Sequence, residues 1–297
     1  MKNILITGHK GFVGTAYHNY FRSENVFGVD IQDELRPLDC RDFFRNYEQH
    51  FNHDYKWDLV IHLAAIIGGR STIENNPLIV ATDLSIDAEF FNWAAKYKPG
   101  RVIYFSSSAA YPIGLQNIQP YVNLSEGHID LKFPGRPDMT YGWSKLTGEM
   151  LAQFLIKLGV PVHVFRPFSG YGETQNLDYP FPSIIRRVKN KETPLTVWGP
   201  GDQCRDFIHI DDIVNGTMAA IERNISGPVN LGTGVATSFR QLARLAATMA
   251  GYEPEIITQP DKPTGVKYRV ANVTKLNTFY TPKITLEEGI TRALKYV

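Results

Sequence analysis

The sequence predicts an α/β fold in which a doubly wound parallel sheet is joined to a smaller C-terminal domain. Residues 4–7 form a short apolar run that leads directly into glycines at positions 8, 11 and 14. That pattern is typical of a buried strand, a tight turn and the start of a helix. Strand-like and helix-like segments then alternate through the first half of the chain, which indicates parallel strands connected by helices. A further strand-like run ends in Asp30, at the place where dinucleotide-binding sheets carry an acidic residue.

The glycines and Asp30 together predict a site for NAD. Gly8 can take a backbone conformation that other residues avoid, Gly11 lets a pyrophosphate approach the chain, and Gly14 lets the helix pack closely on the strand. The helix N-terminus adds free N–H groups and the positive end of its dipole. A carboxylate at Asp30 accepts hydrogen bonds from the ribose hydroxyls and repels a 2′-phosphate, so we expect NAD rather than NADP. The alternative interpretation is a glycine turn beside an unrelated surface aspartate.

The other elements of the first half follow in order from their apolar spacing. We expect helices at residues 13–21, 42–51, 77–97 and 141–158, and further strands at 26–30, 38–39, 59–65, 101–106 and 162–166. Ala64 and Ala65 end one of these strands with small side chains, which lets a dinucleotide lie across the sheet edge, although tight helix packing explains them equally well. Ligands of such sheets bind beyond the carboxyl ends of the strands, where all of these features fall.

Composition argues against several classes of partner. The 297 residues include 31 Lys+Arg and 30 Asp+Glu without a basic stripe, so we expect neither a nucleic acid nor an acidic membrane as partner. The first residues do not resemble a signal peptide, and no apolar stretch is long enough to cross a bilayer. The two cysteines, Cys40 and Cys204, lie far apart in the sequence, which predicts no disulfide framework and a cytoplasmic location. We also expect no bound metal ion.

Two segments carry the predicted chemistry. Ser106, Ser107 and Ser108 follow one strand, and Tyr141 and Lys145 lie four residues apart on one helix face. An ammonium beside a phenol favours the phenolate and lowers the pKa of the tyrosine, so that it can exchange a proton with a sugar hydroxyl or carbonyl. A serine hydroxyl opposite can hydrogen-bond the same substrate oxygen. A Tyr-x-x-x-Lys pattern alone usually marks an exposed helix face, but here it accompanies the dinucleotide pattern and the serine cluster.

With these residues in place, the chain resembles the extended short-chain dehydrogenase/reductase family, the nucleotide-sugar epimerases and dehydratases with a Rossmann domain. The motifs that carry the resemblance span nearly the whole length: GHKGFVG (8–14), HLAA (62–65), SSSAAYP (106–112), YGWSK (141–145), RPFSGYG (166–172), RDFIHIDD (205–212) and PKITLEEGI (282–290). The resemblance implies Asp30 at the adenosine ribose, Asp39 near the adenine amine, and Lys145 at the nicotinamide ribose. It makes Tyr141 the catalytic base and Ser107 the catalytic hydroxyl, with Ser108 as the neighbouring alternative.

The expected division of the chain is an NAD-binding domain at 1–168 and a mostly substrate-binding domain at 169–297, some of whose segments return to the first. Besides the residues already named, the expected cofactor contacts are Phe12, Val13, Ile31, Cys40, Leu63, Ala64, Ala65, Ser106 and Pro167.

The resemblance also implies how a nucleoside-diphosphate sugar would be held. Arg205 and Arg269 match the two arginines that hold the substrate's diphosphate in the family, a task suited to a forked and permanent cation; surface ion pairs are the alternative. Residues 195–199 resemble the strand along the nucleotide base. The chain departs from the family with Ser169 and Asp83 where Asn is usual and with Glu173 where Pro is usual. The expected substrate contacts are Ser108, Tyr141, Ser169, Arg205 and Arg269.

The residues after the catalytic hydroxyl narrow the expected reaction. Family members that eliminate water carry an acid or base there, and 3,5-epimerases carry a cysteine, whereas this chain has Ser108 and Ala109. We therefore expect 4-epimerisation through a transient 4-keto sugar. Alternatives are a 4-ketoreductase in which Lys10 helps to hold NADP, a dehydratase, and a non-catalytic NAD-sensing regulator.

Relatives commonly dimerise through the two helices at 77–97 and 141–158, so a homodimer is expected here as well. Phe90, Trp93, Leu151 and Phe154 are candidates for that contact or for the core.

Overall fold

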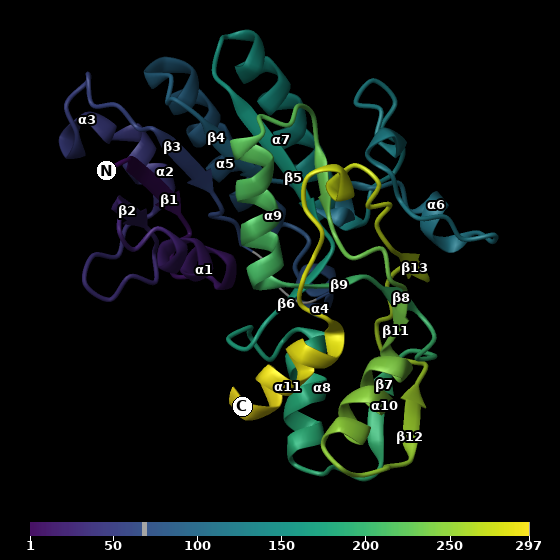
Figure 1. Cartoon of the computed structure of the whole chain (residues 1–297). Coiled ribbons are helices and arrows are strands. Elements are labelled where there is room, and N and C mark those ends of the chain that lie inside the picture. Colours follow the sequence, from purple (N-terminus) through teal and green to yellow (C-terminus); the bar gives the residue numbers. More distant parts are fainter. Residues whose placement is uncertain (67–69, 297) are drawn as a thin grey trace.

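The computed structural model describes residues 1–66 and 70–296 and has a six-stranded, wholly parallel sheet at its centre (Figure 1). The strands are β1 (Asn3–Thr7), β2 (Asn25–Val29), β3 (Leu59–His62), β4 (Val102–Phe105), β5 (Val162–Pro167) and β10 (Val229–Leu231). Their order across the sheet is β10-β5-β4-β3-β1-β2. The order reverses between β1 and β3, so the carboxyl ends of these two strands form the point where such sheets bind ligands. The predicted fold class is confirmed.

Helices cover both faces of this sheet because its strands are apolar on both sides. In β1, Ile4 and Ile6 face one core cluster while Leu5 faces the other, and all three are fully buried. Helices α1 (Phe12–Tyr20) and α9 (Ile210–Glu222) pack on the first face, and α2 (Cys40–Arg45), α5 (Ile79–Tyr97) and α7 (Met139–Lys157) on the second.

The prediction of a strand at 38–39 is wrong. Residues 38–39 are irregular, and the side chain of Asp39 instead caps α2 by accepting a hydrogen bond from the backbone N of Arg41. Pro37 precedes the pair and has no N–H to donate to a neighbouring strand, which disfavours an edge strand there. The helix predicted at 42–51 is divided into α2 and α3 (Tyr47–His50), with Asn46 between them. Two strands also end earlier than expected, at His62 and Phe105.

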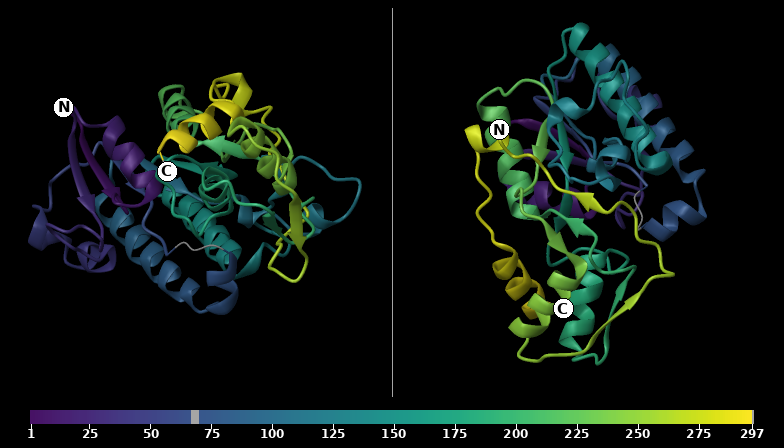
Figure 2. Two further views of the ribbon diagram at one scale, coloured as in Figure 1. Left: turned by 90° about the horizontal axis from the view of Figure 1, so that it is seen from below. Right: turned by 90° about the vertical axis from the view of Figure 1, so that its right-hand side faces the viewer.

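The second half forms a smaller layered unit beside the sheet (Figure 2). Its strands are β6 (Ser169–Tyr171), β7 (Leu195–Trp198), β8 (Cys204–Arg205), β9 (Phe207–His209), β11 (Thr237–Ser238), β12 (Ile256–Gln259) and β13 (Tyr268–Arg269). Helices α8 (Pro180–Lys189), α10 (Phe239–Met249) and α11 (Leu286–Tyr296) share one apolar core with β7 and β9. Helix α9 and strand β10 lie in the sequence of this half but pack into the large sheet.

Short helical segments complete the described chain: α4 (Arg70–Asn75), α6 (Gly114–Asn117) and the 3-10 turns Ser108–Ala110, Glu126–His128 and Leu276–Thr278. Within the described residues, no helix has both the length and the hydropathy that a bilayer-spanning segment requires.

Candidate active site

The glycine turn lies at the reversal point of the sheet. Gly8 has a φ of 73°, in the left-handed region that favours glycine. A Cβ on Gly8 would approach the backbone N of Ala64 to 2.9 Å, and one on Gly14 would lie 2.0 Å from the carbonyl oxygen of Gly8. Gly11 precedes α1 and provides no side-chain cap, so the first N–H groups of this helix remain for a ligand. The turn therefore has the shape that a pyrophosphate requires.

The side chains around the turn divide between core and surface. Phe12, Val13 and Leu63 pack against the core of the α1 face, and Ala64 packs against the opposite core. Ala65 and Pro167 are half-buried at the ends of β3 and β5. The expected cofactor residues on β1, β3 and β5 thus all lie at one edge of the sheet, since parallel strands end on the same side.

Beyond β2, the acidic residues already have protein partners. The two carboxylate oxygens of Asp30 accept hydrogen bonds from the backbone N of Lys10 at 2.9 Å and from that of Gln32 at 2.8 Å. Asp39 binds Arg41 through both of its oxygens. Ile31 is largely exposed, whereas the Cys40 side chain is buried in the core and can offer a ligand only its backbone.

The structure brings the predicted catalytic residues together. Ser107 lies before the short turn Ser108–Ala110, and its side chain hydrogen-bonds that of Tyr141 in the first turns of α7. The ammonium of Lys145 lies 5.7 Å from the centre of the Tyr141 ring and 5.5 Å from that of Tyr104. Ser107 also accepts a hydrogen bond from the backbone N of Ala109 at 3.1 Å, which fixes its hydroxyl. Of the two candidate serines, Ser107 is the one that hydrogen-bonds Tyr141.

The pKa of Tyr141 is not simply lowered, as the motif suggested. Burial raises its pKa, and the carboxylates of Asp83 and Asp87 act in the same direction. Lys145 and Ser107 oppose this by favouring the phenolate, but the net direction is upward. Burial alone would lower the pKa of Lys145, yet Tyr141 in its phenolate form, together with Asp87 and Asp83, raises it above its usual value. The pair is thus a neutral phenol beside a firmly charged ammonium.

A buried polar chain behind Lys145 was not predicted. Thr7 Oγ1 lies 2.8 Å from His62 Nδ1, and His62 Nε2 lies 3.1 Å from Asp87 Oδ1. The hydroxyl of Tyr104 donates to the other oxygen of Asp87 at 2.6 Å. The chain therefore links the end of β1, where the glycine turn begins, to the residues beneath Lys145.

Asp83 lies one helical turn before Asp87 on α5 and is also buried. Its Oδ1 accepts a hydrogen bond from the backbone N of Ile66 at 2.6 Å, while its Oδ2 is buried without a hydrogen-bond partner. Burial raises the pKa of this carboxyl to about 6, despite the opposing effect of Lys145. The departure from asparagine noted in the sequence thus adds a titratable group to the site.

A second buried hydrogen-bond network includes the side chain of Ser106. Its hydroxyl donates to Glu149 at 2.5 Å, and Glu149 forms an ion pair with Arg166 at 2.6 Å. Arg166 also donates to the hydroxyl of Tyr111, which donates in turn to Asn230 on β10. The hydroxyl of Ser106 is therefore engaged with α7 and β5, not turned toward a cofactor. This network joins distant segments, so no local pattern in the sequence reveals it.

The two predicted diphosphate arginines are neighbours. Strands β8 and β13 are parallel, with Arg205 directly opposite Arg269, so both side chains project from the same face. Arg269 donates to Asp138 Oδ2 and to Gln116 Oε1, each at 2.6 Å. Arg205 donates to backbone carbonyl oxygens of Val266 and Thr264. Ser169 lies at the start of β6, half-buried.

Tyr179 is a further residue that interacts electrostatically with Tyr141. It precedes α8 in the second half of the chain, and burial, together with the nearby Tyr141, raises its pKa. The Tyr179 phenol therefore lies within electrostatic reach of Tyr141. The two prolines that follow it, Pro180 and Pro182, indicate the start of a helix, but nothing in the sequence indicates that Tyr179 lies near Tyr141.

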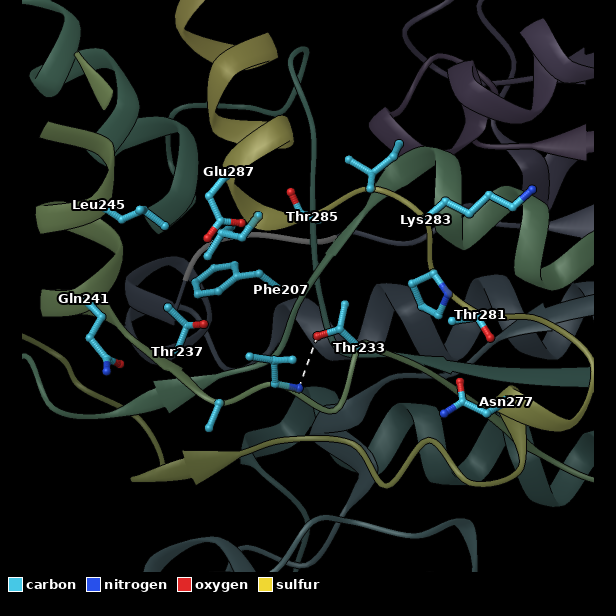
Figure 3. Close-up of a pocket in the computed structure, with 15 residues that line it drawn as sticks. Phe207, Thr233, Thr237, Gln241, Leu245, Asn277, Thr281, Lys283, Thr285 and Glu287 are labelled. Atoms are coloured by element: carbon cyan, nitrogen blue, oxygen red, sulfur yellow. Dashed lines mark hydrogen bonds between the residues drawn. The ribbon is translucent and has the colours of Figure 1, made fainter. Parts of the chain in front are cut away.

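A cavity of about 660 Å³ lies elsewhere, between α10, the start of α11 and the segment that follows β10 (Figure 3). Phe207, Leu245 and Glu287 are among its lining residues, together with part of the segment before α11. None of the predicted site residues lines it, so it is distinct from the candidate active site.

Comparison with known proteins decides the family. The model of the NAD dependent epimerase/dehydratase family matches residues 4–232, more than half of the chain. The chain belongs to this family.

The relatives of this chain are named for different reactions. GDP-L-fucose synthase of Escherichia coli is 24% identical, with 97% of this chain and 94% of that protein aligned. A putative UDP-glucose 4-epimerase of Methanocaldococcus jannaschii is 28% identical, over 99% and 98% of the two chains. Among solved structures, UDP-glucuronic acid 4-epimerase of Bacillus cereus, in complex with UDP-glucuronic acid and NAD, is 27% identical with a TM-score of 0.82, covering 99% of this chain and 98% of that one. The family's enzymes act on nucleotide sugars with NAD, and the individual reaction varies among them.

Proposed function

We propose that the enzyme interconverts nucleoside-diphosphate sugars that differ in configuration at C4, through a transient 4-keto sugar and with NAD as cofactor. The observation that carries the proposal is the grouping of Ser107, Tyr141 and Lys145 without a further acid or base in the Ser108–Ala110 turn. In the turn around Gly8 and Gly14, a Cβ on either glycine would collide with the backbone. This close approach supports NAD as the cofactor.

The three residues have separate roles in the proposed reaction. Tyr141 takes the proton of the C4 hydroxyl and later returns it, while Ser107 hydrogen-bonds the same substrate oxygen. Lys145 stabilises the phenolate, and its raised pKa keeps it charged throughout. NAD, when bound, accepts and returns the hydride and adds a positive charge beside the phenol. Because the hydride returns to the opposite face of the sugar, the product differs only at C4.

Ala109 supports 4-epimerisation over the other reactions of the family. It is buried beside the catalytic serine, at the place where the resemblance implies an acid, a base or a cysteine for dehydration and 3,5-epimerisation. A methyl group cannot remove a proton from carbon.

A 4-ketoreductase is the second candidate. Lys10 lies in a glycine turn of the sequence GHKG, and GDP-L-fucose synthases are among the curated relatives. Such an enzyme would consume reduced cofactor in stoichiometric amounts, whereas an epimerase returns its cofactor unchanged.

One assay series distinguishes the two reactions. A panel of nucleotide sugars is first screened by thermal shift, since a tight ligand raises the melting temperature by mass action. With the best ligand, an epimerase approaches one equilibrium from either C4 epimer without net formation of NADH. In deuterated water the C4 hydrogen is retained, because it travels as hydride. Consumption of NADH or NADPH with a 4-keto sugar, and no interconversion of epimers, would establish the reductase instead.

Two finer expectations belong to the same proposal. Arg205 and Arg269, side by side on β8 and β13, would hold the substrate's diphosphate. A cytoplasmic location is consistent with Cys40 and Cys204, which are both free thiols.

A further inference from the structure

The glycine turn carries two basic side chains, and both face one carboxylate beyond β2. His9 Nε2 lies 3.0 Å from Asp33 Oδ2, and Lys10 Nζ lies 4.0 Å from Asp33 Oδ1. His9 and Asp33 are largely buried, with exposed side-chain fractions of 7% and 15%, whereas Lys10 is 45% exposed. The loop after β2 is therefore joined to the glycine turn through the Asp33 carboxylate.

Asp33 is itself held in place. Its Oδ1 accepts hydrogen bonds from the backbone N of Leu35 at 3.1 Å and from that of Arg36 at 3.4 Å. Partial burial acts to raise the pKa of Asp33, but these hydrogen bonds and the charge of Lys10 outweigh it, and its pKa lies below the usual value. Asp33 thus presents a fixed negative charge to the turn.

The positions of the other groups leave Lys10 between two carboxylates. Its backbone N donates to Asp30 while its ammonium faces Asp33. The His9 ring packs on β2 at Gly28, where a Cβ would come within 2.4 Å of it. Arg36 lies over the Phe27 ring at 4.0 Å and donates to the Gly28 carbonyl, so its guanidinium is directed to β2.

We propose that Asp33 is a second determinant of NAD specificity, because it holds the Lys10 ammonium away from the place where it would bind the 2′-phosphate of NADP. An NADP site needs a cation near the ribose that Asp30 would bind. Lys10 is an exposed cation of this turn, and its ammonium is directed toward Asp33 at 4.0 Å. This inference rests on the NAD site of the proposed function, and it adds restraint of a cation to the repulsion expected from Asp30.

The test measures dissociation constants of NAD and NADP by calorimetry on the wild type and on Asp33→Asn, which keeps an oxygen for the loop's hydrogen bonds. We expect Asp33→Asn to strengthen NADP binding about fivefold, the size of one exposed ion pair, and to change NAD binding by less than about twofold. Lys10→Met in the Asp33→Asn background should remove this gain. Asp42→Asn is the matched control, since it removes an exposed carboxylate of α2 that pairs with Arg45.

Three outcomes would overturn the inference. An unchanged ratio of NADP to NAD affinity in Asp33→Asn, with NAD still bound, would show that Asp33 does not select the cofactor and would leave the proposed reaction standing. An equal gain in Asp42→Asn would reveal a general charge effect, and a gain that survives Lys10→Met would exclude the restraint of that side chain. If the wild type bound neither dinucleotide, the proposed function would fail as well.

Discussion

The protonation of Tyr141 and Lys145 depends on buried residues that lie outside the Tyr-x-x-x-Lys motif. Tyr141 and Lys145 lie near two buried carboxylates, Asp83 and Asp87, of which Asp87 is shared with His62 and Tyr104. Opposite charges stabilise the Lys145 ammonium, but the same carboxylates disfavour a phenolate at Tyr141. The cationic ring of NAD is therefore expected to contribute to the activation of Tyr141.

The first prediction concerns Tyr141. Replacement by Phe removes the proton-transferring hydroxyl but keeps the ring, so turnover should fall on the order of 100-fold or more. Binding of the nucleotide sugar, measured by calorimetry, should stay within a few fold of the wild type. Tyr97→Phe is the control. Tyr97 is the last residue of α5, and its hydroxyl donates to Glu48 of α3. Near-normal turnover of Tyr141→Phe would contradict its role.

The second prediction is a pH-dependent stability difference at Asp83. Its pKa is raised to about 6 by burial, so between about pH 4 and pH 6 the native state binds a proton that the unfolded state has lost. Its contribution to stability therefore declines as the pH rises through this window.

Asp83→Asn removes the charge but keeps an oxygen for the Ile66 N–H. Relative to the wild type, the variant should gain on the order of 2 kcal/mol of unfolding free energy at pH 7 compared with pH 4.5. Urea titrations at the two pH values measure this difference. A difference that does not change with pH would mean that Asp83 is ionised normally.

Among the elements, α7 is the one whose placement decides the geometry of the proposed catalytic residues. It packs on β4 through Gly148, where a Cβ would lie 1.7 Å from the Tyr104 hydroxyl and 2.9 Å from Asp87 Oδ2. On the same helix, Glu149 binds Arg166 of β5. Close approach at one residue and a buried ion pair at the next hold Tyr141 and Lys145 opposite Ser107.

The third prediction tests this contact. In an exposed helix, Gly→Ala is stabilising by about 1 kcal/mol, but Gly148→Ala must displace α7 or the Tyr104 hydroxyl. We expect it to destabilise the protein by roughly 3 kcal/mol and to lower turnover. Gly114→Ala in α6 is the control, because no atom lies within 4 Å of its Cβ position. Equal unfolding midpoints for both variants would exclude tight packing at Gly148.

At the scale of the whole molecule, several partly exposed apolar side chains lie on helices α5 and α7. Helices α5 and α7 pack side by side, and Leu84, Trp143, Met150 and Phe154 are each more than one third exposed. The last three recur at spacings of seven and four, so they lie on one stripe of α7. Of the earlier candidates, Phe90 and Trp93 belong to the core and Leu151 packs against it.

The fourth prediction is that this surface, defined by Leu84, Trp143, Met150 and Phe154, forms a homodimer. Light scattering after size exclusion should give twice the mass of one chain at micromolar concentration. The double variant Met150→Glu and Phe154→Glu should elute as a monomer, because it places charges in an apolar contact. Phe133→Glu, at an 83% exposed residue outside these helices, should remain dimeric. A monomeric wild type would disprove the dimer.

Local patterns in the sequence were sufficient for β1 to β5 of the central sheet, the glycine turn and the Tyr-x-x-x-Lys face. Each depends only on residues that are close in the sequence. The left-handed φ of Gly8 is a property of that residue, and Tyr141 and Lys145 share a helix face because of their spacing. The hydrophobic runs of β1 and β3 predict a buried parallel sheet for the same reason.

Tertiary structure decided the rest, because it concerns contacts between residues far apart in the chain. The hydrogen bond of Ser107 with Tyr141, the pairing of Arg205 with Arg269 and the burial of Asp83 all arise when separate elements pack. The strand expected at 38–39 did not form, since Asp39 caps α2 instead. Burial and long-range charge also reversed the expected direction of the Tyr141 pKa. Periodicity records which residues are apolar, but the electrostatic environment of a side chain depends on what packs around it.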